Sequence, residues 1–148
     1  MSIRKLDGAA LLQWADSLAR AGVVYAPQAR GDRFAYAPLR SGKDLRLDHD
    51  VTLLPPKKYL LPQRERLLQF DKAGSVASVY EEGPFTLFGV HPYDIAAIRQ
   101  ADTYYTKDAP DAHYLARRRN VTIVGCDVQN ASANVFAGCM GTAVAKEG

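Results

Sequence analysis

The first part of the chain shows a helical pattern of apolar positions. Leu11, Ala15 and Leu18 recur at intervals of four and three residues, which places them on one face of a helix. Asp7 is a suitable N-cap before this pattern, and the pattern stops at a glycine. The sequence therefore predicts a helix over residues 6–21.

Two runs of β-forming residues follow this helix. Residues 23–28 and 33–39 are rich in β-branched and aromatic side chains and flank a short polar segment, which predicts a β-hairpin. Pro27 and Pro38 have no backbone N–H to give to a neighbouring strand. We therefore expect these strands at a sheet edge, or the prolines at strand ends.

Residues 53–71 form an unusual segment in which prolines are interspersed with apolar side chains. Pro55, Pro56 and Pro62 exclude a continuous helix and favour extended backbone. We expect the apolar side chains of this segment to pack on the core. The alternating pattern of residues 75–81 predicts a half-buried strand.

Two continuous apolar runs, residues 85–90 and 121–124, are typical of strands inside a sheet. A helix over residues 95–101, capped by Asp94, is predicted after the first run, and a helix over residues 111–119 leads into the second. Strands that alternate with helices indicate the α/β class. We expect the two runs to be neighbouring strands whose following loops hold the functional residues.

The composition fits one folded domain. The chain has 148 residues, of which 47% are hydrophobic and 24% charged, and these are ordinary values for a globular protein. We therefore predict a single compact α/β domain over residues 1–148. Its expected architecture is a mixed β-sheet with flanking helices, together with an N-terminal helix plus hairpin.

Charge, hydropathy and cysteine content exclude several classes of protein. The net charge is only +3, and the basic residues are spread among acidic ones except in two short clusters, residues 57–58 and 117–119, so no nucleic-acid-binding face is predicted. No apolar stretch is long enough to span a membrane, and the N-terminus lacks the apolar core of a signal peptide. Two cysteines do not make a disulfide framework of the secreted type. These features predict a cytoplasmic protein that does not insert into membranes.

No arrangement of residues in the sequence indicates a catalytic mechanism. The three histidines lie far apart, and no nucleophile-elbow motif is present. Cys126 and Cys139 each follow a glycine; with His91 or Asp94 they offer a zinc or iron site, and they fit equally well as small buried residues without a ligand. His91 follows a predicted strand, where it fits a ligand, a proton donor or a hydrogen-bonded turn residue.

Four stretches together resemble the first domain of a family of redox subunits. They are residues 55–65, which contain a lysine–aromatic–proline–arginine–glutamate pattern, and residues 87–94, 114–125 and 135–142. The family includes the beta subunits of cytoplasmic sulfhydrogenases and NiFe hydrogenases and one subunit of anaerobic sulfite reductase, which carry 4Fe-4S dicluster domains. The resemblance covers nearly the whole chain, and it implies a subunit of an oxidoreductase complex that transfers electrons.

The chain departs from the family pattern at the positions of the cluster ligands. Tyr93, Val128, Val135 and Ala137 stand where the family has cysteines, and His91 stands where it has an arginine. None of the four replacements can bind iron as a thiolate does. The resemblance therefore implies a lost cluster site, with no cofactor on this chain and an iron–sulfur cluster or flavin on partner subunits. Relatives continue into a ferredoxin-like part with repeated C-x-x-C motifs, which we expect to be absent here or supplied by another chain.

The leading hypothesis is an accessory or docking subunit of a multisubunit redox complex, not catalytic by itself, whose partners are other redox subunits. The predicted partner contacts are Lys57, Lys58, Arg64, His91, Tyr93 and Arg117. Two alternatives remain open. One is an electron-transfer protein with a rebuilt metal or iron–sulfur site at Cys126 and Cys139. The other is a small-molecule-binding or catalytic domain that reuses the vacated pocket near His91, Tyr93 and Asp127.

Overall fold

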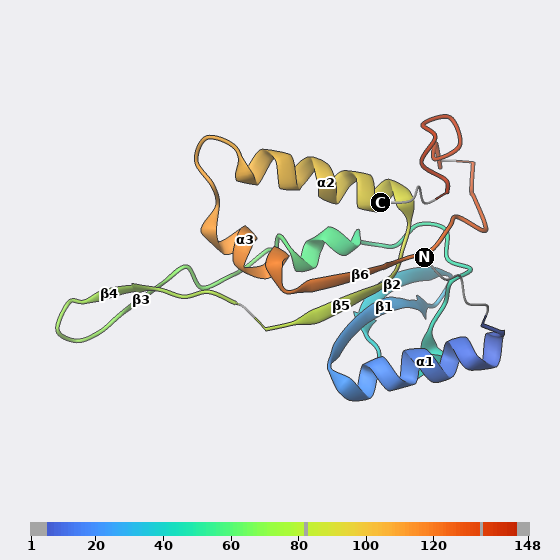
Figure 1. Ribbon diagram of the computed structural model, residues 1–148, viewed down its shortest axis with the longest axis horizontal. Coiled ribbons are helices and arrows are strands. Elements are labelled where there is room, and N and C mark those ends of the chain that lie inside the picture. The colour runs from blue at the N-terminus through green and yellow to red at the C-terminus, as the bar shows by residue number, and fades with distance from the viewer. Residues whose placement is uncertain (1–5, 82, 134, 145–148) are drawn as a thin grey trace.

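The computed structural model describes residues 6–81, 83–133 and 135–144. Figure 1 shows its helices and strands in their arrangement around one twisted sheet. In chain order the elements are α1 (Gly8–Ala21), β1 (Val23–Arg30), β2 (Arg33–Pro38), the 3-10 helices η1 (Gly42–Asp44) and η2 (Pro56–Tyr59), β3 (Leu68–Phe70), β4 (Val76–Ser78), β5 (Phe85–Val90), α2 (Pro92–Thr106), α3 (Ala112–Arg119) and β6 (Val121–Gly125).

The main sheet is mixed, as the sequence predicts. Its strand order is β2-β1-β5-β6, with β1 and β2 antiparallel and with β5 parallel to both β1 and β6. Helix α1 covers one face, and α2 and α3 cover the other (Figure 1). Because β5 and β6 run parallel and side by side, their carboxyl ends meet at one edge of the sheet. The α/β class, the hairpin and the pairing of the two apolar runs are therefore confirmed.

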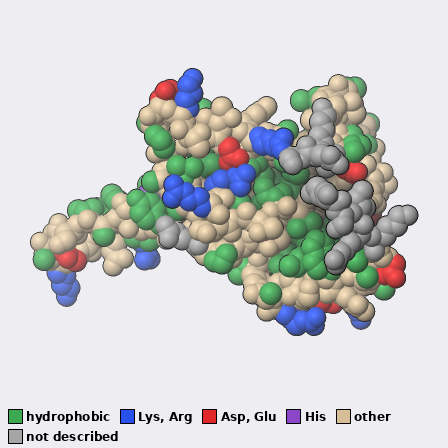
Figure 2. Space-filling view, in the orientation of Figure 1, with side chains coloured by type: hydrophobic (Ala, Val, Ile, Leu, Met, Phe, Trp, Pro, Cys, Tyr) green, Lys and Arg blue, Asp and Glu red, His purple; other side chains and the backbone are tan. Residues whose placement is uncertain are grey.

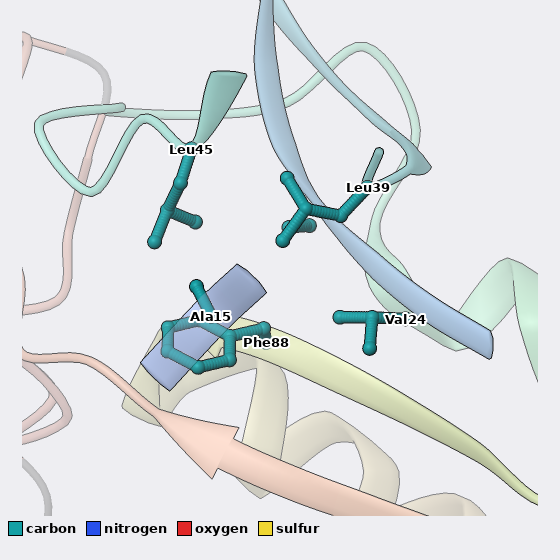
Figure 3. Close-up of a cluster of buried hydrophobic side chains, with 6 residues drawn as sticks. Ala15, Val24, Leu39, Leu45 and Phe88 are labelled. Atoms are coloured by element: carbon teal, nitrogen blue, oxygen red, sulfur yellow. The ribbon is translucent and has the colours of Figure 1, made fainter. Parts of the chain in front are cut away.

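The core lies in two layers, one on each face of the sheet. On the α1 side, Val24 and Phe88 pack with Ala15 (Figure 3). The centre of the Trp14 ring lies 5.2 Å from that of the Phe88 ring. On the opposite side Leu87 is completely buried. Neighbouring residues such as Leu87 and Phe88 thus face opposite layers, because successive side chains of a strand point to opposite faces of the sheet. The burial of each such side chain contributes ~1.5–3 kcal/mol to the stability of the fold.

The beginning of the chain folds as its sequence predicts. The carboxylate of Asp7 accepts a hydrogen bond of 2.7 Å from the backbone N–H of Ala10 and caps α1, which ends before Gly22. The hairpin turn falls at Gly31, whose φ of 62° lies in the left-handed region that glycine adopts without strain.

The prediction for Pro27 is wrong, whereas that for Pro38 is confirmed. Pro38 ends β2 at the sheet edge, but Pro27 lies inside β1, between β2 and β5. The carbonyl of Pro27 accepts from the N–H of Arg46 rather than from β2, so the side of Pro27 that lacks an N–H faces away from β2. The pairing of β1 with β5 has already ended at Tyr25, so no ladder bond is lost at Pro27.

The segment after η2 differs most from expectation. Leu60 is fully buried as predicted, but Leu67, Leu68 and Phe70 are exposed. Strands β3 and β4 pair only with each other and project from the body as a hairpin (Figure 1). The strand predicted over residues 75–81 is present as β4, but its predicted half-burial is wrong, because no described element covers either face of this hairpin.

Two further element boundaries are corrected by the structure. Helix α2 begins at Pro92, so His91 is its N-cap and Asp94 lies within its first turn instead of capping it. Proline suits this first position because its missing N–H has no intrahelical partner there. Strand β6 is an edge strand that is only partly buried, not an interior one. Among the described residues, no helix has the length and apolar character needed to cross a membrane.

Candidate functional site

The carboxyl ends of β5 and β6 are tied together by backbone bonds and by a bulge. The N–H of Cys126 donates to the carbonyl of Val90 over 2.9 Å. The ladder shifts at Gly89, which has a φ of 71° and whose carbonyl accepts from the Tyr36 hydroxyl at 2.8 Å. A side chain at Gly89 would meet Leu47 at 2.8 Å, so the close approach of the loop there requires glycine.

Two stacked histidines lie beneath this edge. The rings of His49 and His91 are 4.0 Å apart and nearly parallel, and both side chains are almost completely buried. The Nδ1 of His91 lies 3.0 Å from the carbonyl oxygen of Cys126, and its Nε2 lies 3.1 Å from the carbonyl oxygen of His49. Burial, and secondly the charge of His91, lower the pKa of His49 to about 4, so the His49 ring is neutral at pH 7.

The first turn of α2 continues the site. The hydroxyl of Tyr93 donates to the carbonyl of Asp50 over 2.9 Å, and burial raises the pKa of that phenol. Burial also raises the pKa of Asp94 to about 6, although the charges of His91 and Lys57 act in the opposite direction. The Oδ1 atom of Asp50 is buried and has no hydrogen-bond partner among the described residues.

An apolar pocket of about 230 Å³ opens beside Tyr93. The described residues that line it are Val51, Tyr93, Val135, Phe136, Ala137, Met140 and Thr142. Three of the four positions at which the family resemblance implies cysteines, Tyr93, Val135 and Ala137, therefore converge on one cavity. Val128 is not among the lining residues, and its N–H donates to the carbonyl of Ala143.

This lining does not fit an iron–sulfur cluster. Such clusters are held by thiolates, in some cases with histidine, and the described lining contains no cysteine, histidine or carboxylate. A second pocket of about 180 Å³ shares Met140 and Thr142 and continues along α2 towards Arg99. The two pockets together present an apolar face on the C-terminal loop.

The two cysteines do not form a ligand set with their neighbours. Cys126 is partly buried, its thiol donates to the carbonyl of Asp127, and burial raises its pKa, which favours the thiol over the thiolate. Cys139 is exposed. His91 offers no lone pair to a metal, because both its nitrogens face carbonyl oxygens. Within the described part of the chain, no group of three or more histidine, cysteine or acidic residues is arranged to hold a metal ion.

The predicted partner contacts separate into surface and interior residues. Lys57 and Arg64 are exposed. Lys58 is half-buried, with its Nζ 2.9 Å from the carbonyl of Tyr36. His91 and Arg117 are buried, which corrects their assignment to a contact surface.

Arg117 has a structural role that the basic cluster at residues 117–119 does not suggest. Its Nε donates to the carbonyl of Leu60 over 2.9 Å, and its Nη1 pairs with Glu65. The next residue, Arg118, forms an ion pair of 2.8 Å with Asp102 on α2. The cluster at the end of α3 is therefore used mainly inside the molecule, where it joins α3 to η2 and α2.

His49 belongs to the site, and sequence reasoning missed it. It lies in a polar stretch that reads as a loop, 42 residues before His91. The alternation of Leu45, Leu47 and His49 with the exposed ion pair of Arg46 and Asp48 was the available signal. It shows that one side of this stretch faces the core.

The fold and this site together define an α/β domain with an apolar pocket where its parallel strands end. Over 121 residues the chain is 35% identical to Sulfhydrogenase 2 subunit beta of Pyrococcus furiosus, a match that covers 82% of this chain and 36% of that protein. The chain thus spans about a third of the length of the curated relative it matches. This similarity supports a likeness to hydrogenase beta subunits. No family model matches the chain. No solved structure matches it either.

Proposed function

We propose that this chain is a non-catalytic accessory domain that docks onto the other subunits of a multisubunit redox complex and carries no cluster of its own. The similarity to a sulfhydrogenase beta subunit supports the membership of a redox complex. The observation that carries the loss of the cluster is the convergence of Tyr93, Val135 and Ala137 on one pocket. An iron–sulfur cluster or a flavin would then reside on the partner subunits.

The chemistry of the pocket supports this reading. Val135, Ala137 and Met140 supply an apolar lining, and the phenol of Tyr93 is turned to Asp50 by its hydrogen bond. A volume of about 230 Å³ is below the ~300–1,000 Å³ typical of small-molecule sites, so the pocket does not favour a metabolite. The replacement of ligating cysteines by apolar side chains would leave a small apolar pocket of this kind.

The docking surface that we propose is the arm, defined as residues 67–79 and containing β3 and β4. A two-stranded hairpin is marginally stable alone in water, and exposed apolar groups on such a hairpin mark a contact with another molecule. Phe70 is 67% exposed, and Leu67, Leu68 and Val76 are each about half exposed. Figure 2 shows hydrophobic side chains along the whole of this projection.

The edges and charges of the arm add to the argument. Neither β3 nor β4 has a second neighbour among the described strands, so both outer edges are open to pairing with a strand of a partner. Arg64 and Arg66, exposed just before the arm, form no ion pair within the described chain, whereas Glu65 between them is neutralised by Arg117. A partner with an apolar surface bordered by carboxylates therefore fits best.

Metal content after anaerobic purification tests the loss of the cluster. We expect the wild-type chain to be folded, colourless and free of stoichiometric iron and zinc, also after incubation with iron and sulfide. A matched variant restores the four thiols: Tyr93→Cys, Val128→Cys, Val135→Cys and Ala137→Cys. We expect this variant to bind iron and to gain visible absorption under the same treatment.

Two results would overturn the proposal. Stoichiometric iron on the wild-type chain that is lost in a Cys126→Ser, Cys139→Ser double variant would establish a rebuilt site at those residues. A wild-type chain that purifies from its native host as a monomer, without any flavin-containing or iron–sulfur subunit, would remove the docking role.

A further inference from the structure

The contacts of the two His91 ring nitrogens bear on the protonation of the ring. A backbone carbonyl oxygen accepts hydrogen bonds and cannot donate one. Both ring nitrogens of His91 lie within hydrogen-bond distance of such an oxygen, 3.0 Å to Cys126 and 3.1 Å to His49. A neutral imidazole has one N–H and one lone pair, so one nitrogen would face a carbonyl oxygen lone pair to lone pair. Only the doubly protonated ring satisfies both contacts.

We propose that His91 is a buried imidazolium in the folded protein, and that its two N–H groups hold in place the loops that wall the apolar pocket. This inference concerns the described residues alone and does not rest on the proposed redox function. It assigns a positioning role to a side chain that lies behind the pocket rather than in it.

The groups that surround His91 can stabilise a positive charge. The Asp94 carboxyl, three residues along α2, interacts favourably with a charged His91, and this interaction lowers the pKa of Asp94 against the larger effect of burial. The carboxyl of Asp50 lies in the same region, with one oxygen buried and without a partner. The His49 ring stacked on His91 is held neutral by burial, so no second cation competes there at pH 7.

Three features oppose the charge. The first is burial, because it disfavours the charged form of a histidine ring, as it does for His49. His91 is the N-cap of α2, where the helix dipole disfavours a cation, and Lys57 lies close enough to act on Asp94. Three further groups in this region are neutral at pH 7: the phenols of Tyr36 and Tyr93 and the thiol of Cys126, whose pKa values are all raised by burial. Two charge-assisted hydrogen bonds, each about twice as strong as a neutral one, act against both burial and the dipole.

The same contacts connect three segments that are distant in sequence. One N–H holds the loop that contains His49, and the other holds the chain directly after β6 at Cys126. Tyr93 adds a second tie to the His49 loop through the carbonyl of Asp50. Val51 and Tyr93 both line the pocket, so the distance between these two walls depends on the His91 ring, which joins the loop of His49 to the start of α2.

Nitrogen NMR of the full chain labelled with ¹⁵N-histidine tests the charge directly. At pH 7 we expect both ring nitrogens of His91 to show bonded protons in slow exchange with solvent, and the His49 ring to show one. A His113→Gln variant identifies the third histidine by loss of its signals. An unprotonated ring nitrogen in His91 at pH 7 would overturn the proposal, even if no variant folds.

The positioning role has its own readout. When pH is raised until His91 loses a proton, the backbone amide signals of Val51 and Tyr93 should shift in step with its ring signals. A His91→Gln variant should show the same two shifts at pH 7, whereas His113→Gln should show neither. Val51 and Tyr93 signals that stay in place while the His91 ring titrates would show that the ring does not position the pocket.

Discussion

Asp94 and His49 give the stability of this fold opposite dependences on pH, and replacing Asp94 by asparagine should reveal one of them. Burial raises the pKa of Asp94 from 3.8 to about 6, so the folded state binds its proton more tightly than the unfolded chain does. The stabilisation from this protonated carboxyl is complete below pH 3.8 and is lost as pH rises to about 6. At 1.36 kcal/mol per pKa unit the loss is ~3 kcal/mol, which we reduce to ~2 kcal/mol because the side chain is only partly buried.

The His49 ring acts in the other direction. Its pKa is lowered from 6.5 to about 4, so in this range the unfolded chain binds the proton and the folded state does not. The free energy of unfolding therefore rises between pH 4 and 6.5, by ~3 kcal/mol for this nearly inaccessible ring. In the wild-type protein the two effects oppose each other over almost the same pH range.

Urea denaturation at intervals from pH 3.5 to 7.5 measures the difference. The free energy of unfolding of Asp94→Asn should equal that of the wild type near pH 3.5 and exceed it by ~2 kcal/mol at pH 7, with the difference developing between pH 4 and 6. His49→Gln serves as the control, since its stability should fall relative to the wild type over the same range. Parallel pH profiles for wild type and Asp94→Asn, or an asparagine variant that is less stable at pH 7, would refute the reasoning.

Three further substitutions test other features by urea denaturation. Arg117→Met leaves the carbonyl of Leu60 and the carboxylate of Glu65 without their arginine partner, so the free energy of unfolding should fall by ~2–4 kcal/mol. An unchanged urea midpoint would contradict the structural role of this arginine. Gly89→Ala should lower the free energy of unfolding by ~3 kcal/mol, because φ is positive there and the new Cβ would lie 2.8 Å from the Leu47 side chain. Gly31→Ala, with a positive φ but open space around it, should lower it by ~1 kcal/mol. Equal losses at the two glycines would show that the contact has no effect. On the proposed docking role, Phe70→Ser should change the free energy of unfolding by less than ~0.5 kcal/mol yet abolish co-elution with the proposed redox partners; retained co-elution would exclude Phe70 from the proposed docking surface.

The sequence predicts the parts of the fold that local patterns determine. The helix capped by Asp7, the hairpin and the two apolar strands follow from periodicity and from turn chemistry, which act over a few residues. The pairing of β5 with β6 could also be anticipated, because a helical connection between two apolar runs favours parallel neighbours.

Features that depend on contacts distant in sequence could not be predicted in this way. His49 meets His91 only because the loop before η2 folds under the end of β5. Arg117 has the composition of a solvated helix end, and only its reach to Leu60 and Glu65 makes it an interior residue. The burial of the arm is wrongly predicted for the opposite reason. Its alternating apolar side chains have the pattern of a buried strand, but no element of the described chain covers them.

The separation of the arm from the body has an evolutionary consequence. Strands β3 and β4 bond only to each other, so the folding free energy of the body depends little on which side chains the arm carries. Substitutions there escape the purifying selection that stability imposes on Leu87 or Phe88 in the core. If the arm docks as proposed, a lineage that inherits this scaffold can exchange one partner for another by mutating roughly a dozen residues of the arm, with the rest of the domain held constant.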